Sequence, residues 1–254
     1  MSADYHVHVI AHGEYQYSEE WLNRYLERAK QRRIRAIGLV EHDEYRDRVD
    51  WDLIKSLRGP ELHVACGLEI DFLPGREETI KEMLSQYPLD FVIGSVHFIN
   101  GWPFDHPDYR QQFASADIDQ VYGDYFELMD KMVRCGLFDI VGHLDLIKLW
   151  GHRPVIKNSL QYALPVLHSI KATGMIIEIN SAGIRKPVRE MYPSLDIIGE
   201  MFRLGLPVTM GSDAHHPDQV AEDFADISQA LWNIGYRRVV ALRGRKTFPL
   251  PLTI

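Results

Sequence analysis

The sequence has 254 residues, of which 46% are hydrophobic and 25% are charged, as in an ordinary globular protein. Asp and Glu number 36 against 28 for Lys and Arg, and the net charge of −8 disfavours a nucleic-acid partner but leaves room for a small anionic ligand. No run approaches the roughly 18 apolar residues that a membrane span needs, so we expect a cytoplasmic protein with no membrane partner.

Short apolar runs rich in β-branched residues alternate with amphipathic stretches of helical period along the chain. The runs predict strands over residues 4–10, 36–41, 62–72, 91–97, 140–144, 175–180 and 207–211, with an eighth candidate at 238–242. Strands that alternate with helices predict a parallel sheet, and closing this sheet gives a TIM-like α/β barrel. We expect one domain over residues 1–254.

Residues that commonly cap helices precede several of the amphipathic stretches. Ser18, Asp117 and Ser194 each stand where a side-chain oxygen can accept hydrogen bonds from free backbone amides. The stretch 100–115 contains Pro and Asp and lacks a clear period, which predicts a long functional loop or lid.

Most of the 12 histidines lie at the C-terminal end of a predicted strand or just past it. His6 and His8 are two positions apart on the first strand, so the strand period points both side chains to one face. The other polar residues at strand ends, in chain order, are His12, Glu41, His42, Glu69, His97, His143, Asp145, Glu178, Asn180, Asp213 and His215. Because the ends of parallel strands meet at one rim of a barrel, we expect these side chains to line its mouth.

A single histidine at a strand end is more often a structural residue than a ligand. A whole ring of unpaired polar groups would instead cost about 1–3 kcal/mol for each group. Metal ions remove that cost, since imidazole and carboxylate bind first-row ions such as Zn, Mn and Fe. The set exceeds what one ion can bind, so it predicts two or three divalent ions. Ions about 3.5–4 Å apart stabilise a bridging hydroxide, which is chemistry for phosphate-ester hydrolysis.

An ordered set of these residues resembles the PHP (polymerase and histidinol phosphatase) superfamily, and within it the monofunctional histidinol-phosphatase branch. The matching elements are His6-x-His8, Glu41-His42, Glu69, Gly94-Ser-Val-His97, Gly142-His143 and Gly211-Ser-Asp213-Ala-His215. The resemblance implies a distorted seven-stranded (β/α) barrel with a trinuclear centre. It also implies hydrolysis of L-histidinol phosphate to L-histidinol and phosphate, in histidine biosynthesis, through a metal-bridging hydroxide.

The same resemblance implies how the ligands are shared among three ions. One ion would bind His6, His8, Glu69 and Asp213, a second would share Glu69 and add His97 and His143, and a third would bind His12, His42 and His215. Asp213 or His215 would protonate the leaving alkoxide, and the sequence does not choose between them.

The branch-level resemblance rests on residues 97–102, on the insert that follows them, and on residues 180–187. It makes Arg185 a candidate for gripping the phosphate and offsetting charge during catalysis, since a guanidinium binds two phosphate oxygens at once. Further candidate substrate contacts are Lys148 and Arg153 for phosphate, Asp105 and Glu14 for an amino group, and Trp102 for an imidazole ring.

Three alternatives remain open at this stage. The first is a PHP-type phosphoesterase for another small phosphate ester or a nucleotide. The second is an amidohydrolase-like barrel, although Glu69 and not a lysine stands at the bridging position. The third is a metal-binding accessory module without catalytic activity.

Overall fold

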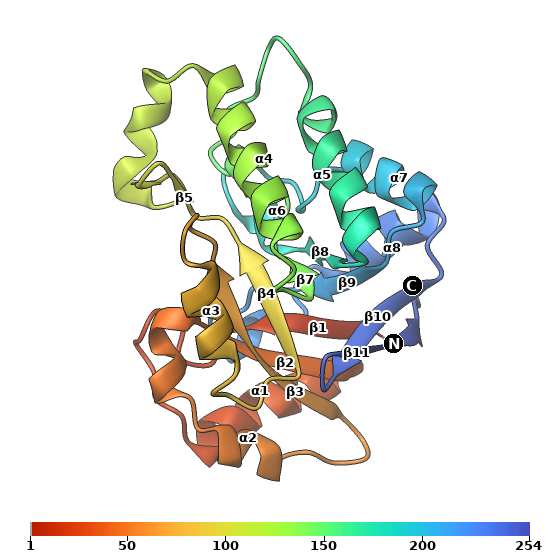
Figure 1. Ribbon diagram of the computed structural model, residues 1–254. Coiled ribbons are helices and arrows are strands. Elements are labelled where there is room, and N and C mark those ends of the chain that lie inside the picture. The colour runs from red at the N-terminus through yellow and green to blue at the C-terminus, as the bar shows by residue number, and fades with distance from the viewer. Residues whose placement is uncertain (1) are drawn as a thin grey trace.

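A computed structural model describes residues 2–254 of the protein (Figure 1). Seven parallel strands form one sheet in the order β1-β2-β3-β4-β7-β8-β9. Their bounds are β1 Ser2–Val7, β2 Ile34–His42, β3 His63–Asp71, β4 Phe91–Ser95, β7 Ile140–Val141, β8 Ile176–Asn180 and β9 Val208–Gly211. Each of the seven predicted runs overlaps one of these strands, which confirms that part of the prediction.

The sheet curls so that its first and last strands meet. Val7 forms a parallel bridge with Ala214, just past β9. The His8 amide donates to the Ala214 carbonyl at 2.8 Å, and the Ala214 amide donates to the His6 carbonyl at 3.2 Å. The predicted distorted TIM-like barrel is therefore confirmed, and the seam of its closure runs through the histidines of β1.

Helices cover the outside of the barrel, with α1 to α3 beside β1–β4 and α4, α5 and α7 on the other side (Figure 1). The α-helices are α1 Glu19–Gln31, α2 Trp51–Ser56, α3 Glu77–Leu84, α4 Ile118–Arg134, α5 Ser159–Thr173, α6 Ala182–Arg185, α7 Leu195–Leu204 and α8 Phe224–Ile234. Short 3₁₀ helices are η1 Asp43–Arg48, η2 Pro107–Ala114, η3 Leu146–Lys148 and η4 Pro217–Gln219. No helix within residues 2–254 is long and apolar enough to cross a membrane.

Two of the three predicted helix caps are confirmed. Ser18 accepts a hydrogen bond from the Trp21 amide at 3.1 Å, and Asp117 accepts from the amides at the start of α4. Ser194 does stand at the N-cap of α7, but its hydroxyl donates to Asp196 and accepts no cap hydrogen bond from the helix within residues 2–254. The capping hydrogen bond predicted for this side chain was therefore wrong, since the hydroxyl is turned toward the Asp196 carboxylate.

The eighth candidate strand lies outside the barrel sheet. It is β10 Arg238–Arg243, which pairs antiparallel with β11 Lys246–Pro251. This hairpin packs against the N-terminal ends of the barrel strands, where the Tyr5 hydroxyl donates to the Leu242 carbonyl and accepts from its amide, both at 2.7 Å. This run is therefore part of a hairpin that covers the N-terminal end of the barrel, here called the closed end.

The stretch 100–115, expected as a loop or lid, contains some regular structure. A two-stranded ribbon of β5 Phe98–Ile99 and β6 Trp102–Pro103 leads into η2. The Trp102 ring lies 4.6 Å from that of Phe113, and Phe113 stacks on His152 at 4.8 Å. These aromatic contacts hold the insert against the loop that precedes α5.

Candidate metal centre

The predicted ligands meet at one cavity at the C-terminal ends of the barrel strands. The cavity has a volume of about 420 Å³. Its lining residues are His12, His42, Glu69, His97, Asp105, His143, Leu146, Leu149, Ala182, Arg185, Lys186, Tyr192, Asp213, His215 and Gln219. His6 and His8 lie directly beneath it and are fully buried. The structure therefore brings most of the predicted rim to one cavity, whereas Glu41, Asp145, Glu178 and Asn180 are not among its lining residues.

Glu69, on β3, stands at the centre of the ring of histidines, and its two carboxylate oxygens face different imidazoles. Oε2 lies 3.1 Å from Nε2 of His6, 3.4 Å from Nε2 of His8 and 3.3 Å from Nδ1 of His42. Oε1 lies 3.1 Å from Nε2 of His143 and 3.8 Å from Nε2 of His97. A carboxylate placed in this way can bridge two cations, one on each oxygen.

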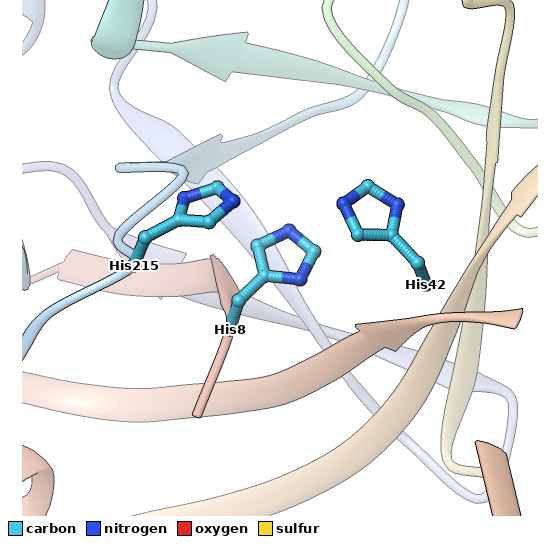
Figure 2. Close-up of side chains that lie close together, drawn as sticks. All are labelled: His8, His42 and His215. Atoms are coloured by element: carbon cyan, nitrogen blue, oxygen red, sulfur yellow. The ribbon is translucent and has the colours of Figure 1, made fainter. Parts of the chain in front are cut away.

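Three overlapping sets of side chains bring their ligand atoms within 4.8 Å of one another. They are His6 with His8 and Asp213, His6 with Glu69 and His143, and His8 with His42 and His215. Figure 2 shows the last set, in which the His8 ring lies between the other two, with ring centroids 4.6 Å from His42 and 4.5 Å from His215. The three rings come from the ends of β1, β2 and β9, so barrel closure brings them together.

His12 has a different place from the one expected. The third set holds His8 where we expected His12. The His12 ring nevertheless lines the cavity and stacks on His215, with centroids 4.6 Å apart. Ala11 lies between His8 and His12 in the chain, and its positive φ of 52° turns the backbone there. His12 is therefore beside the cluster, and its role as a ligand stays a prediction.

Two imidazoles and two carboxylates of the ring are deprotonated at pH 7, as metal ligands must be, whereas nearby carboxylates outweigh burial and raise the pKa of His6 and His97 well above the ordinary value and that of His8 to about 9. Burial lowers the pKa of His42 well below its ordinary value and lowers the pKa of His215 to about 4, so both imidazoles are neutral at pH 7. Burial would raise the pKa of Glu69, but the imidazoles of His6 and His42 hold it well below its usual range. Burial would also raise the pKa of Asp213, but His6 and His215 lower it by more than burial raises it, so this carboxylate is ionised.

Several buried polar atoms at the ring have no hydrogen-bond partner within residues 2–254. They include Nδ1 of His8, Nδ1 of His143, Nε2 of His215 and one oxygen of Glu41. In addition, Nε2 of His6 and Nε2 of His8 face each other at 3.1 Å beside the same Glu69 oxygen. Unpartnered nitrogen and carboxylate donors at this density fit divalent ions, which use such lone pairs as ligands.

Carboxylates behind the histidines hold the imidazoles in place; the sequence analysis expected Glu41 and Glu178 at the rim but assigned them no such role, and it did not single out Asp71. His6 Nδ1 lies 2.7 Å from Glu178, and His97 Nδ1 is hydrogen-bonded to Asp71. Glu41 accepts from the amides of residues 9 and 10, beside His8. Such partners orient metal-binding imidazoles. Asp71 had a usable signal, since it lies two positions after Glu69 on one strand and shares its face.

Two predicted substrate contacts line the cavity. Arg185 does so while its guanidinium contacts Asp223 at 2.7 Å, Glu222 at 3.2 Å and the Ser212 carbonyl at 2.9 Å. Asp105, from the insert, also lines the cavity; burial would lower the pKa of His97, but Asp71 and, to a smaller extent, Asp105 raise it well above its ordinary value.

The other predicted substrate contacts do not line this cavity as the structure describes it. Lys148 is 1% exposed, and its ammonium lies 2.9 Å from Asp145 and 2.7 Å from the Met191 carbonyl. Arg153 is paired with Glu190, Trp102 packs within the insert, and Glu14 accepts from the His12 amide. Their placement does not favour the predicted roles of these four residues.

A parallel α/β barrel with this ring of imidazoles and carboxylates at its mouth defines a metal-dependent hydrolase. Residues 4–182 match the model of the PHP domain family. The chain therefore belongs to the PHP domain family, which confirms the resemblance seen in the sequence.

Relatives of known name agree with this family. A protein of Deinococcus radiodurans named probable histidinol-phosphatase is 40% identical over 188 residues, which are 74% of this chain and 71% of the relative. One of Schizosaccharomyces pombe with the same name is 31% identical over 183 residues, 67% of this chain and 60% of the relative.

A solved structure has the same fold. It is a histidinol phosphate phosphatase from Lactococcus lactis in complex with zinc, L-histidinol and phosphate. The two chains share 18% sequence identity and superpose with a TM-score of 0.81, covering 97% of this chain and 98% of the other.

Proposed function

We propose that this protein hydrolyses L-histidinol phosphate to L-histidinol and phosphate, with two or three divalent first-row ions held around Glu69. The observation that carries the proposal is the division of the Glu69 oxygens between two groups of imidazoles at the floor of one cavity. The names of the relatives and the zinc, L-histidinol and phosphate in the Lactococcus structure support this choice of substrate and metal.

The ring residues would hold the ions in two main groups. His6, His8 and Asp213 surround one oxygen of Glu69, and His143 and His97 surround the other. Divalent ions in such a site supply Lewis acidity toward phosphoryl oxygens and make water acidic enough to act as a nucleophile near neutral pH. His12, His42 and His215 are the residues available for a third ion.

Arg185 is the proposed phosphate contact from the protein. A guanidinium has one N–H on Nε and two on each Nη. The contacts to Glu222, Asp223 and Ser212 use one N–H on each nitrogen, which leaves one on each Nη for phosphate oxygens. The two carboxylates also fix the side chain, so that its geometry is set before substrate binds.

Asp105 is the proposed contact for the substrate amino group, because it brings a carboxylate to the cavity that the cationic Arg185 also lines. A small molecule with a cationic amino group and an anionic phosphate matches this pair of opposite charges. Asp213 and His215 are both deprotonated at pH 7 without metal, which suits ligands. That one of them protonates the leaving alkoxide stays a prediction.

The test is a comparison of kcat/KM for L-histidinol phosphate with the values for a panel of sugar phosphates, nucleotides and amino-alcohol phosphates, by release of inorganic phosphate. The expected result is a clear preference for L-histidinol phosphate, lost together with bound metal in the His6→Ala, His8→Ala double variant. Similar values across the panel would defeat the proposed substrate and leave a general phosphoesterase. No turnover of any ester by metal-loaded protein would favour an accessory metal-binding module.

A further inference from the structure

We propose that Glu178 is a positioning residue that aligns ligands on both sides of Glu69, and that Gly211 is a glycine in order to make room for it. The inference rests on the ligand assignment proposed above and extends it to two residues outside the ligand set. Glu178 lies on β8 and is 1% exposed, beneath the floor of the cavity.

The two carboxylate oxygens of Glu178 reach two different proposed ligands. Oε1 lies 2.7 Å from Nδ1 of His6, and Oε2 accepts from the backbone amide of His143 at 2.9 Å. The side-chain amide of Asn180 donates to Oε2 at 3.1 Å and fixes its orientation. β8 pairs with β9 and β7, so its side chains can reach the ends of both β1 and β7 across the closed barrel.

The contact with His6 determines which nitrogen of this imidazole can bind a metal ion. The buried Glu178 carboxylate accepts a hydrogen bond from Nδ1 of His6, so Nδ1 keeps its proton and Nε2 is the nitrogen that can give up a proton to a metal ion. Nε2 is the atom that faces Glu69 at 3.1 Å and Asp213 at 3.7 Å. Carboxylates that bind the second nitrogen of a metal-binding histidine commonly set its ring orientation and its basicity.

The contact with His143 acts through the backbone. Its amide is held by Glu178, while its Nε2 lies 3.1 Å from the other oxygen of Glu69. By contrast, Asp71 contacts only His97 among the proposed ligands, within the part of the chain that the structure describes. Glu178 is therefore placed to couple the two groups of imidazoles that share Glu69.

Gly211, at the end of β9, faces the Glu178 carboxylate. A Cβ atom on this residue would lie 1.8 Å from Oε1 of Glu178 and 2.8 Å from Cβ of His6. Both neighbours are buried and packed, so neither can move aside without disturbing a proposed ligand. The requirement for glycine is steric here, since the φ angle of Gly211 is not in the left-handed region.

The test uses the full chain and zinc as the probe. Glu178→Gln keeps the size of the side chain and removes its charge. We expect zinc affinity, measured by competition with a chromophoric chelator, to fall by about 10–100-fold, the range typical for partners of metal-binding histidines. In the zinc-loaded protein, ¹⁵N NMR of the His6 ring is expected to show a protonated Nδ1 and a zinc-bound Nε2 in the wild type, and to lose this single pattern in the variant. A purely structural role for Glu178 would leave this signature unchanged.

Gly211→Ala is expected to reproduce both effects, because it displaces the same carboxylate. The double variant should then have about the same zinc affinity as whichever single variant binds zinc less tightly. The reason is that the effects of substitutions at two residues in contact are not additive when these residues act as a unit. Matched controls are Glu200→Gln and Gly199→Ala on the outer helix α7, where Glu200 is buried and a Cβ on Gly199 meets nothing within 4 Å. Both controls should keep wild-type zinc affinity.

Unchanged zinc affinity and an unchanged His6 tautomer in folded Glu178→Gln would overturn the proposal. Fully additive losses in the double variant would overturn the role of Gly211. If Gly211→Ala does not fold, Glu178→Gln alone decides the question. None of these readouts needs the substrate, so failure to hydrolyse L-histidinol phosphate would defeat the proposed function and leave this test standing.

Discussion

The two ends of the barrel are built from the same strands but are filled in opposite ways. At the N-terminal end, the β10–β11 hairpin covers a small apolar cluster that includes Tyr5, Phe91 and Ile140. At the C-terminal end, His42, Glu69 and Asp213 lie on or just past barrel strands and line a cavity. One end is closed by packing, and the other is left open for ligands.

The polar groups at the two ends differ in how fully they are hydrogen-bonded. At the closed end, Asp90 accepts from the amides of Cys66 and Gly244 at 3.1 and 2.9 Å and pairs with Arg58. At the open end, nitrogens of His8, His143 and His215 have no partner within residues 2–254. A buried group without a partner costs free energy, so the open end gives up stability that bound metal can restore.

The largest expected effect comes from the centre of the open end. Glu69→Gln keeps the side-chain size but removes the charge that both groups of imidazoles share. Bound metal ions contribute several kcal/mol to phosphate-ester hydrolysis. A loss of about 4 kcal/mol lowers kcat/KM about a thousandfold, and we expect at least that loss, with metal content reduced in elemental analysis. Wild-type activity and full metal content in Glu69→Gln would contradict the view that the open end differs from the closed end in binding metal.

A change at the closed end should act on stability alone. Phe91 is fully buried and packs edge-on against Tyr5, with ring centroids 5.0 Å apart. Phe91→Ala is expected to lower the free energy of unfolding by about 3–5 kcal/mol through loss of packing and formation of a cavity. The activity of each folded molecule should be unchanged. The control is Val155→Ala, whose side chain is 90% exposed, with an expected change within about 0.5 kcal/mol. A fall in kcat/KM for folded Phe91→Ala would show that the two ends are coupled.

The smallest expected effect concerns how well the closed end excludes solvent. Burial raises the pKa of the Cys66 thiol to about 11, whereas Cys135 is only half-buried. Because the thiolate is the reactive form, alkylation at pH 8 should label Cys135 first, as followed by mass spectrometry. Labelling of Cys66 should accelerate as pH rises toward 11, and at pH 8 it should need unfolding. Equal labelling of both thiols in the native protein would show that the closed end admits solvent.

The clustering of the proposed ligands was predictable because their signals are local. His6 and His8 share a face through the period of a strand, and the ends of parallel strands meet at one rim. The barrel and its family followed from the same pattern. The helix caps at Ser18 and Asp117 were also local signals, and the structure confirms them.

Apart from that of Asp71, the supporting contacts were not predictable, because they join residues far apart in the chain. Glu178 and His6 are separated by 172 positions, and only barrel closure brings them together. Lys148 looked like a free cation in the sequence, but its ammonium is buried against Asp145 and a backbone carbonyl. The run at β10 had the period of a strand, and no local signal distinguishes a strand of the barrel from a strand of a hairpin that covers its end.

The most direct test of the metal centre is a crystal structure of the zinc-loaded protein, with anomalous scattering at the zinc edge to locate the ions. We predict at least two anomalous peaks, one at each carboxylate oxygen of Glu69, with His6 and His143 as ligands at about 2.0–2.1 Å from zinc. Peaks that lie outside the ring, or a single ion that does not contact Glu69, would contradict the account.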